Sequence, residues 1–237
     1  MQNAPALYAS GVGLLHRDLD LDLALLGWLA LLPFLVAAWR ELRGQRFLPA
    51  GANQHWWLGA CVVLAWLWSL QVRAVGGLEL GLLGGAFITL LFGRARGFLA
   101  LLAALLLHAL FAGGSWVNLG LNALLLAALP AWLTTWAQAR IARHLPHNVF
   151  VFMIGNGLFV VFGVTALTAL ARIATAAALA PAGAHLQWED AMAYALLLAW
   201  GEALLSGMVF SALVIYRPDW VLSYDQDTYL PPRRRSS

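Results

Sequence analysis

Lysine is absent from the 237-residue sequence, and charged residues of every kind make up only 11% of it. A Walker A loop needs its lysine to reach the nucleotide phosphates, so the chain cannot hydrolyse ATP by that route. The single cysteine, Cys61, excludes an intrachain disulfide and a cysteine-based zinc site. Because soluble domains carry roughly 25% charged residues, this composition argues against a soluble catalytic module.

Catalytic signatures are missing as well. The sequence contains no HExxH motif, no GxSxG motif and no paired-cysteine motif. No Ser/His/Asp arrangement with defensible geometry can be assembled either. We therefore expect that the protein is not an enzyme.

Apolar residues dominate the sequence. They make up 62% of the chain, the mean hydropathy is +0.77, and several runs approach the roughly 20 residues that a helix needs to cross a bilayer. The sequence predicts an all-α, polytopic membrane helix bundle, with a single transmembrane domain over residues 1–230 and a short basic tail over 231–237. About seven spans are predicted, at 21–39, 56–73, 78–93, 97–112, 119–138, 149–173 and 191–216.

The arginines test this number of spans, because positive residues collect in cytoplasmic loops. They follow alternate spans, as Arg40, Arg43, Arg46, Arg94, Arg96, Arg140, Arg143, Arg217 and Arg233 to Arg235. The opposite ends hold most of the loop acids, which are Asp18, Asp20, Asp22, Glu79, Glu189 and Asp190. This alternation predicts an N-out, C-in, multi-pass membrane protein. Its surroundings are lipid, and no nucleic-acid partner is expected.

Polar residues inside a bilayer are costly and are functional candidates by default. His108 ends the fourth predicted span, and Asn118 and Asn122 begin the fifth, on either side of a Gly113-Gly114 turn. His108 either bonds a helix end or lines a site. Asn118 is expected to cap the fifth helix, because asparagine is a preferred N-cap residue. Asn122 serves equally well as an interhelical hydrogen-bonding group or as a site residue.

Two more polar residues lie deeper. Glu202 is in the middle of the last span, close to Gly201 and Gly207, and a carboxylate there needs a partner. It is either a buried interhelical acceptor or a functional group. Asn156, between two glycines of the sixth span, has the same two interpretations.

Three segments resemble a known family. LELGLLGGAFITLLFGRARG (78–97), GGSWVNLGLNALLL (113–126) and GEALLSGM (201–208) resemble the membrane substrate-binding component of cobalt and nickel energy-coupling-factor transporters, the CbiM/NikM type. LPHNVFVFMIGNG (145–157) and YRPDWVLSYDQDTYL (216–230) are similar to a proteobacterial branch of uncharacterised permeases. The resemblance implies seven spans with the N-terminus outside, a divalent cobalt or nickel ion as substrate, and a separate ATPase and coupling transmembrane subunit.

The chain departs from this family at the metal ligands. In the family, the N-terminal amine, a histidine at position two and the histidine of a His-Leu-Leu-Gly-Gly segment hold the metal. Here these two positions are Gln2 and Gly81. Gly120, Asn122 and Glu202 do match the family pattern.

Substitute ligands can be proposed for the missing histidines. His108, Asn122, Glu79 and His16 are the candidates, and one His, one Glu and one Asn could form a weaker and harder site. Asn118, Asn156 and Glu202 then serve structural or coupling roles. The sequence thus predicts the permease component of a transition-metal transporter. The alternative is a non-transporting membrane scaffold or assembly factor that keeps this fold and has lost the metal site.

Overall fold

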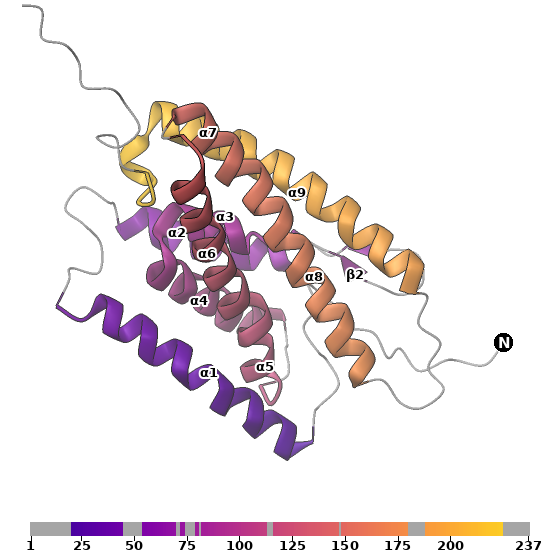
Figure 1. Ribbon diagram of the computed structural model, residues 1–237. Coiled ribbons are helices and arrows are strands. Elements are labelled where there is room, and N and C mark those ends of the chain that lie inside the picture. Colours follow the sequence, from indigo (N-terminus) through magenta and orange to yellow (C-terminus); the bar gives the residue numbers. More distant parts are fainter. Residues whose placement is uncertain are drawn as a thin grey trace, which may run out of the picture.

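The computed structural model describes residues 20–44, 54–69, 72–73, 79–80, 82–112, 116–146, 148–179 and 188–224 (Figure 1). Long helices pack against one another, as the composition predicts. In chain order the elements are α1 (Leu21–Leu42), α2 (Gln54–Ser69), β1 (Val72–Arg73), β2 (Glu79–Leu80), α3 (Gly85–Phe92), α4 (Arg94–Ala112), α5 (Leu119–Ala123), η2 (Leu124–Ala128), α6 (Leu129–His144), α7 (Val149–Ile154), η3 (Gly155–Val160), α8 (Val161–Ala178), α9 (Trp188–Tyr216) and η4 (Pro218–Trp220).

Several of these elements join into longer rods. The π-helical turn η2 joins α5 to α6, and the π-helical turn η3 joins α7 to α8. Within the described ranges, five helical segments are long and apolar enough to cross a membrane: α1, α4, α5–α6, α7–α8 and α9. The expectation of an all-α, polytopic membrane bundle is confirmed.

The predicted span over 78–93 is wrong as a single helix. Residues 79–80 form β2, which pairs antiparallel with β1, residues 82–84 are not helical, and only Gly85–Phe92 is helix. Gly84 has φ +66°, a left-handed conformation that favours glycine and that starts α3. A short apolar run cannot distinguish a helix from an extended segment by periodicity, which is why the pattern misled.

Other boundaries moved by a few residues. The second helix ends at Ser69, so the predicted end at 73 falls in β1. α2 has 16 residues and α3 has 8, corresponding to about 24 Å and 12 Å of helix, short of a bilayer core of about 30 Å. The first arginines of α4 and the last arginines of α6 lie within those helices rather than beyond them.

One end of the bundle gathers the arginines. There Arg94 of α4 forms an ion pair with Glu41 of α1, 2.8 Å apart, and the indole N–H of Trp57 of α2 donates to the carbonyl of Arg96. We call this the arginine-rich end, and the opposite end, which carries β1 and β2, the hairpin end.

The segment after α9 closes the arginine-rich end over α3. The backbone N–H of Leu222 donates to the carbonyl of Leu91 at 2.7 Å, and the Ser223 hydroxyl donates to the carbonyl of Leu90. These two carbonyls are in the last turn of α3 and would otherwise lack partners. The last turn of α3 therefore lies at the arginine-rich end.

Candidate functional site

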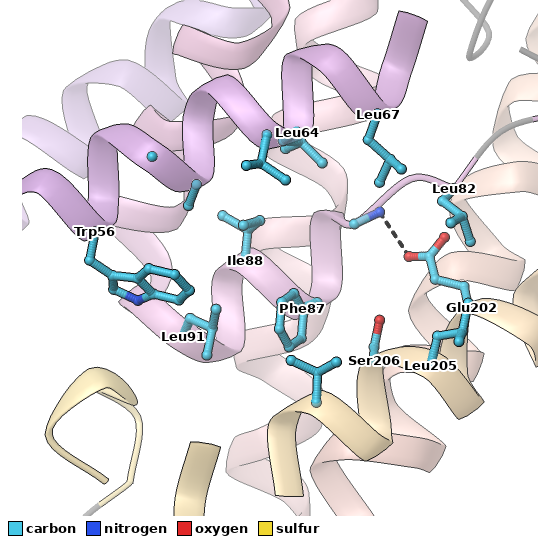
Figure 2. Close-up of a pocket in the computed structure, with 15 residues that line it drawn as sticks. Trp56, Leu64, Leu67, Leu82, Phe87, Ile88, Leu91, Glu202, Leu205 and Ser206 are labelled. Carbon is cyan, nitrogen blue, oxygen red and sulfur yellow. Dashed lines mark hydrogen bonds between the residues drawn. The ribbon is translucent and has the colours of Figure 1, made fainter. Parts of the chain in front are cut away.

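The carboxylate of Glu202 binds the non-helical stretch that precedes α3. Its two oxygens accept hydrogen bonds from the backbone N–H groups of Leu83, at 2.7 Å, and Gly84, at 2.9 Å. The Thr165 hydroxyl of α8 donates to the same carboxylate at 3.1 Å. Figure 2 shows Glu202 pointing from α9 toward this stretch, with the bond from Gly84 drawn. We call these three hydrogen bonds the Glu202 latch.

The latch supplies hydrogen-bond acceptors to non-helical backbone inside the helix bundle. Non-helical backbone is tolerated at membrane depth only where protein buries it and satisfies its polar groups. Leu83 is 4% exposed and Glu202 is 2% exposed, so water does not supply these bonds. The carbonyl of Leu83 in turn accepts from the indole N–H of Trp68 of α2, at 3.0 Å. Glu202 is thus a buried hydrogen-bond acceptor that links α9 to α8 and to the stretch before α3.

A positive charge accompanies the buried carboxylate. Arg172 of α8 interacts electrostatically with Glu202, and within the described residues its Nε atom has no hydrogen-bond partner. The carboxylate also lies at the N-terminus of α3, where the helix dipole favours negative charge. The Glu202 side chain therefore lies among backbone N–H donors, at a helix N-terminus.

An apolar groove of about 360 Å³ lies beside the latch, between α2, α3 and α9. Figure 2 shows Leu64 and Leu67 on one side of it, with Ser206 and Leu205 on the other. Its lining is almost entirely aliphatic and aromatic, so it is suited to a hydrocarbon group and poorly suited to a metal ion.

His108 is buried in α4 with an exposed fraction of 2%. Its Nδ1 atom lies 3.3 Å from the hydroxyl of Ser69, the last residue of α2. β1 begins three residues after Ser69, so His108 contacts the chain shortly before this strand. The imidazole therefore makes an interhelical contact between α4 and the end of α2.

Asn118 and Asn122 are buried at the start of α5, with exposed fractions of 0% and 2%. Asn118 does occupy the N-cap position, but its side chain makes no cap hydrogen bond, so the predicted capping role is wrong. The backbone there has φ −84° and ψ −4°, a helical conformation, whereas a capping residue adopts an extended one.

The glycine that precedes Asn122 has a packing role. A Cβ atom on Gly120 would lie 2.8 Å from the backbone nitrogen of Trp28, and one on Gly27 would lie 2.9 Å from that of Leu121. The backbones of α1 and α5 thus touch at this crossing. The motif that carries Asn122 is therefore positioned by α1.

Asn156 lies within the π-helical turn η3 and is 1% exposed. Within the described residues its Oδ1 atom has no hydrogen-bond donor. π-helical turns are frequent at functional sites, and a buried amide without a full set of partners is costly. Gly157 beside it packs against Gly207 of α9, whereas a Cβ atom on Gly201 would meet no atom within 4 Å.

The complete set of candidate ligands is not described. His16, Gln2 and Gly81 lie outside the described residues, and only the backbone of Glu79 is placed. Within the described residues, no three His, Cys, Asp or Glu side chains form a group that could hold a metal ion. Whether His108, Asn122, Glu79 and His16 come together stays a prediction.

Sequence reasoning missed Thr165, which belongs to the latch, and Trp68, which donates to the carbonyl of Leu83. Trp68 reads as an ordinary apolar residue of α2, and Thr165 as a helix-compatible residue of an apolar span. Glycines at 84 and 85 after a short apolar run were the one available signal of a break in the third span.

The fold defines a multi-pass α-helical membrane protein. The chain belongs to the CbiM family, described as the cobalt uptake substrate-specific transmembrane region, whose family model matches residues 18–220. The protein is thus a membrane component of metal uptake. The resemblance to the CbiM/NikM type is confirmed.

Solved structures agree on the fold. A truncated transition metal transporter has a TM-score of 0.64 and 17% identity, covering 84% of this chain and 96% of its own. A second transition metal transporter has a TM-score of 0.63 and 17% identity, covering 83% and 89%. No curated protein sequence matches the chain.

Proposed function

We propose that this protein is the substrate-binding permease component of an energy-coupling-factor transporter for cobalt or nickel ions. The family match over residues 18–220 carries the proposal. The chain has no lysine for a nucleotide-binding loop, so a separate ATPase and a coupling transmembrane subunit supply the energy. The protein lies in the bacterial inner membrane, N-terminus outside, with its arginine-rich end in the cytoplasm.

The metal enters at the hairpin end, which then faces outward. His108 and Asn122 are the described candidates there, and His16 and Glu79 complete the proposed ligand set. Imidazole suits nickel, and amide and carboxylate oxygens make a harder site, so the set binds a divalent ion more weakly than a cage built from nitrogen alone. The Ser69 contact supports this assignment, because it engages Nδ1 of the imidazole at the end of α2.

The Glu202 latch couples this outer region to the bundle. Segment 82–84 leads into α3, and the N–H groups of Leu83 and Gly84 donate to Glu202 of α9, whose carboxylate also accepts a hydrogen bond from Thr165 of α8. A displacement of the hairpin on metal binding therefore acts on both helices. Asn156, in the π-helical turn that packs on α9, is the second proposed coupling residue, and Asn118 supports the outer turn.

Metal binding by the purified full-length protein tests the proposal. Nickel, cobalt, copper and zinc are titrated into wild type, His108→Ala, Glu79→Ala and the control His144→Ala. His144 is exposed at the arginine-rich end, where its ring contacts the carbonyl of Arg140, so its loss should leave binding unchanged. Micromolar or tighter nickel or cobalt binding that weakens in the first two variants alone supports the assigned ligands.

A scaffold or assembly role is the second candidate. Gln2 and Gly81 stand where the resemblance places two metal-binding histidines, which favours this alternative. Under it, wild type binds none of the four metals. Copurification then decides: stable capture of an ATPase and a coupling subunit speaks for transport, whereas capture of a different membrane protein speaks for the scaffold.

A further inference from the structure

A second groove lies along η2 and α6. It has a volume of about 670 Å³ and is lined by Phe34 of α1, by Ala171 of α8, and by one face of η2 and α6. That face comprises Leu124, Leu125, Leu129, Trp132, Leu133 and Trp136. We call it the α6 groove. Its lining is apolar throughout.

The dimensions of the α6 groove match one leaflet of a bilayer. From Leu124 to Trp136 the helix rises by about 18 Å, at 1.5 Å per residue. Half of the hydrocarbon core of a bilayer is about 15 Å thick. The groove is thus long enough to hold the hydrocarbon chain of a lipid along its length, and its volume lies in the range of small-molecule sites.

The end of the groove at Trp136 is positively charged. The guanidinium of Arg140 stacks on the ring of Trp136 at 4.8 Å, and that of Arg94 stacks on the ring of Trp132 at 5.5 Å. Arg94 is already balanced by its ion pair with Glu41. Arg140 and Arg143 are exposed on the last turns of α6, and neither forms an ion pair within the described part of the chain.

The helix geometry aligns these charges with the groove. Leu129, Trp132, Trp136, Arg140 and Arg143 follow one another at intervals of three or four residues, so they share one face of α6. Edge contacts of Trp132 with Phe34, at 4.9 Å, and with Phe98, at 5.3 Å, fix the indole at the floor. An apolar channel therefore ends at aromatic rings and unbalanced arginines at the arginine-rich membrane surface.

From this juxtaposition we propose that the α6 groove binds an anionic phospholipid of the arginine-rich leaflet. One acyl chain lies along η2 and α6, and the headgroup phosphate meets Arg140 and Arg143. Basic residues near a membrane surface attract anionic lipids, each strengthening binding by about fivefold. A zwitterionic lipid would occupy the same channel without the contribution of its headgroup. The site is independent of metal binding, because it involves none of the candidate ligands.

Competitive lipid retention tests the site. The full-length protein is placed in nanodiscs with equal amounts of phosphatidylglycerol and phosphatidylethanolamine that carry identical acyl chains, and the retained lipids are measured by native mass spectrometry. Arg140→Gln should lower the preference for phosphatidylglycerol about fivefold, and the double variant with Arg143→Gln about 25-fold. Arg217→Gln is the matched control, because Arg217 also stacks on a tryptophan, Trp220, but outside the groove.

A steric variant tests the channel itself. Ala171→Leu adds bulk to the groove wall and should reduce retention of both lipids, with the thermal midpoint of unfolding used to check that the protein is folded. Equal retention of the two lipids by wild type would overturn the proposal. A preference for phosphatidylglycerol that is unchanged in the Arg140 variants would also overturn it. The same holds if Ala171→Leu leaves lipid retention intact but abolishes association with a membrane partner protein, because a protein helix would then occupy the groove.

Discussion

Replacing Glu202 by glutamine tests whether the latch holds segment 82–84 in place. The carboxylate accepts three hydrogen bonds, two of them from backbone N–H groups of Leu83 and Gly84. Glutamine has nearly the same shape but only one acceptor oxygen, and its amide N–H₂ would face one of these donors. One buried N–H group loses its acceptor, and the remaining bonds lose the assistance of the charge.

The magnitude follows from the number of bonds. A hydrogen bond to a charged group contributes about 1.5–3 kcal/mol, and an unsatisfied buried donor costs about 1–3 kcal/mol. Glu202→Gln should therefore destabilise the local structure by about 3 kcal/mol. This corresponds to a roughly hundredfold larger equilibrium constant for local opening. The variant should keep the fold elsewhere, because segment 82–84 is short.

Amide hydrogen exchange in nanodiscs measures this effect directly. The peptide that contains Leu83 and Gly84 should exchange about a hundredfold faster in Glu202→Gln than in wild type, whereas α4 and α8 peptides should change little. Ser206→Ala, one turn along α9 in the same groove wall, is the control and should match wild type. Exchange at Leu83 and Gly84 that is equal in all three proteins would refute the idea that the carboxylate holds this segment.

Three further predictions concern the packing around the site. Thr165→Val should lower stability by about 2 kcal/mol, because its hydroxyl donates to the Glu202 carboxylate. The control Thr168→Val, one turn away, should be neutral or stabilising, because its buried hydroxyl has no partner within the described residues. Thermal unfolding in detergent compares the two variants, and equal effects would contradict the latch. Trp68→Phe should cost about 1–3 kcal/mol, because a buried carbonyl loses its indole donor, and should speed exchange in segment 82–84. Gly120→Ala should cost about 1–3 kcal/mol of stability, because its Cβ would meet the backbone of α1. The control Gly163→Ala should cost nothing, because no atom lies within 4 Å of its Cβ. The two unfolding midpoints should therefore differ, and coincident midpoints would argue against the close helix crossing.

The predicted and observed folds agree where the signal was local and long. A run of about 20 apolar residues specifies a membrane helix whatever its neighbours, so α1, α4 and α9 were predicted to within a few residues. The third span failed because its apolar run is short and interrupted by Gly84 and Gly85. An extended segment inside a membrane is stable only when distant residues satisfy its backbone, and the run itself carries no information about them.

The candidate site was predicted less completely than the fold. Burial of His108, Asn122 and Glu202 followed from their positions in apolar runs. The Ser69 partner of His108 did not, because it is 39 residues away in the sequence. The predicted cap at Asn118 rested on a residue preference, and the backbone conformation adopted at that position overruled it.

The sequence by itself determined the class of this protein. Scarce charge and arginines after alternate spans indicate a multi-pass membrane protein, because the free energy of placing charge in hydrocarbon acts on each segment independently. The absence of lysine excludes a Walker A loop. Only the tertiary structure decided what the buried Glu202 does. Its donors at Leu83 and Gly84 lie 119 and 118 residues away, and packing of α9 against the start of α3 brings them within hydrogen-bonding distance.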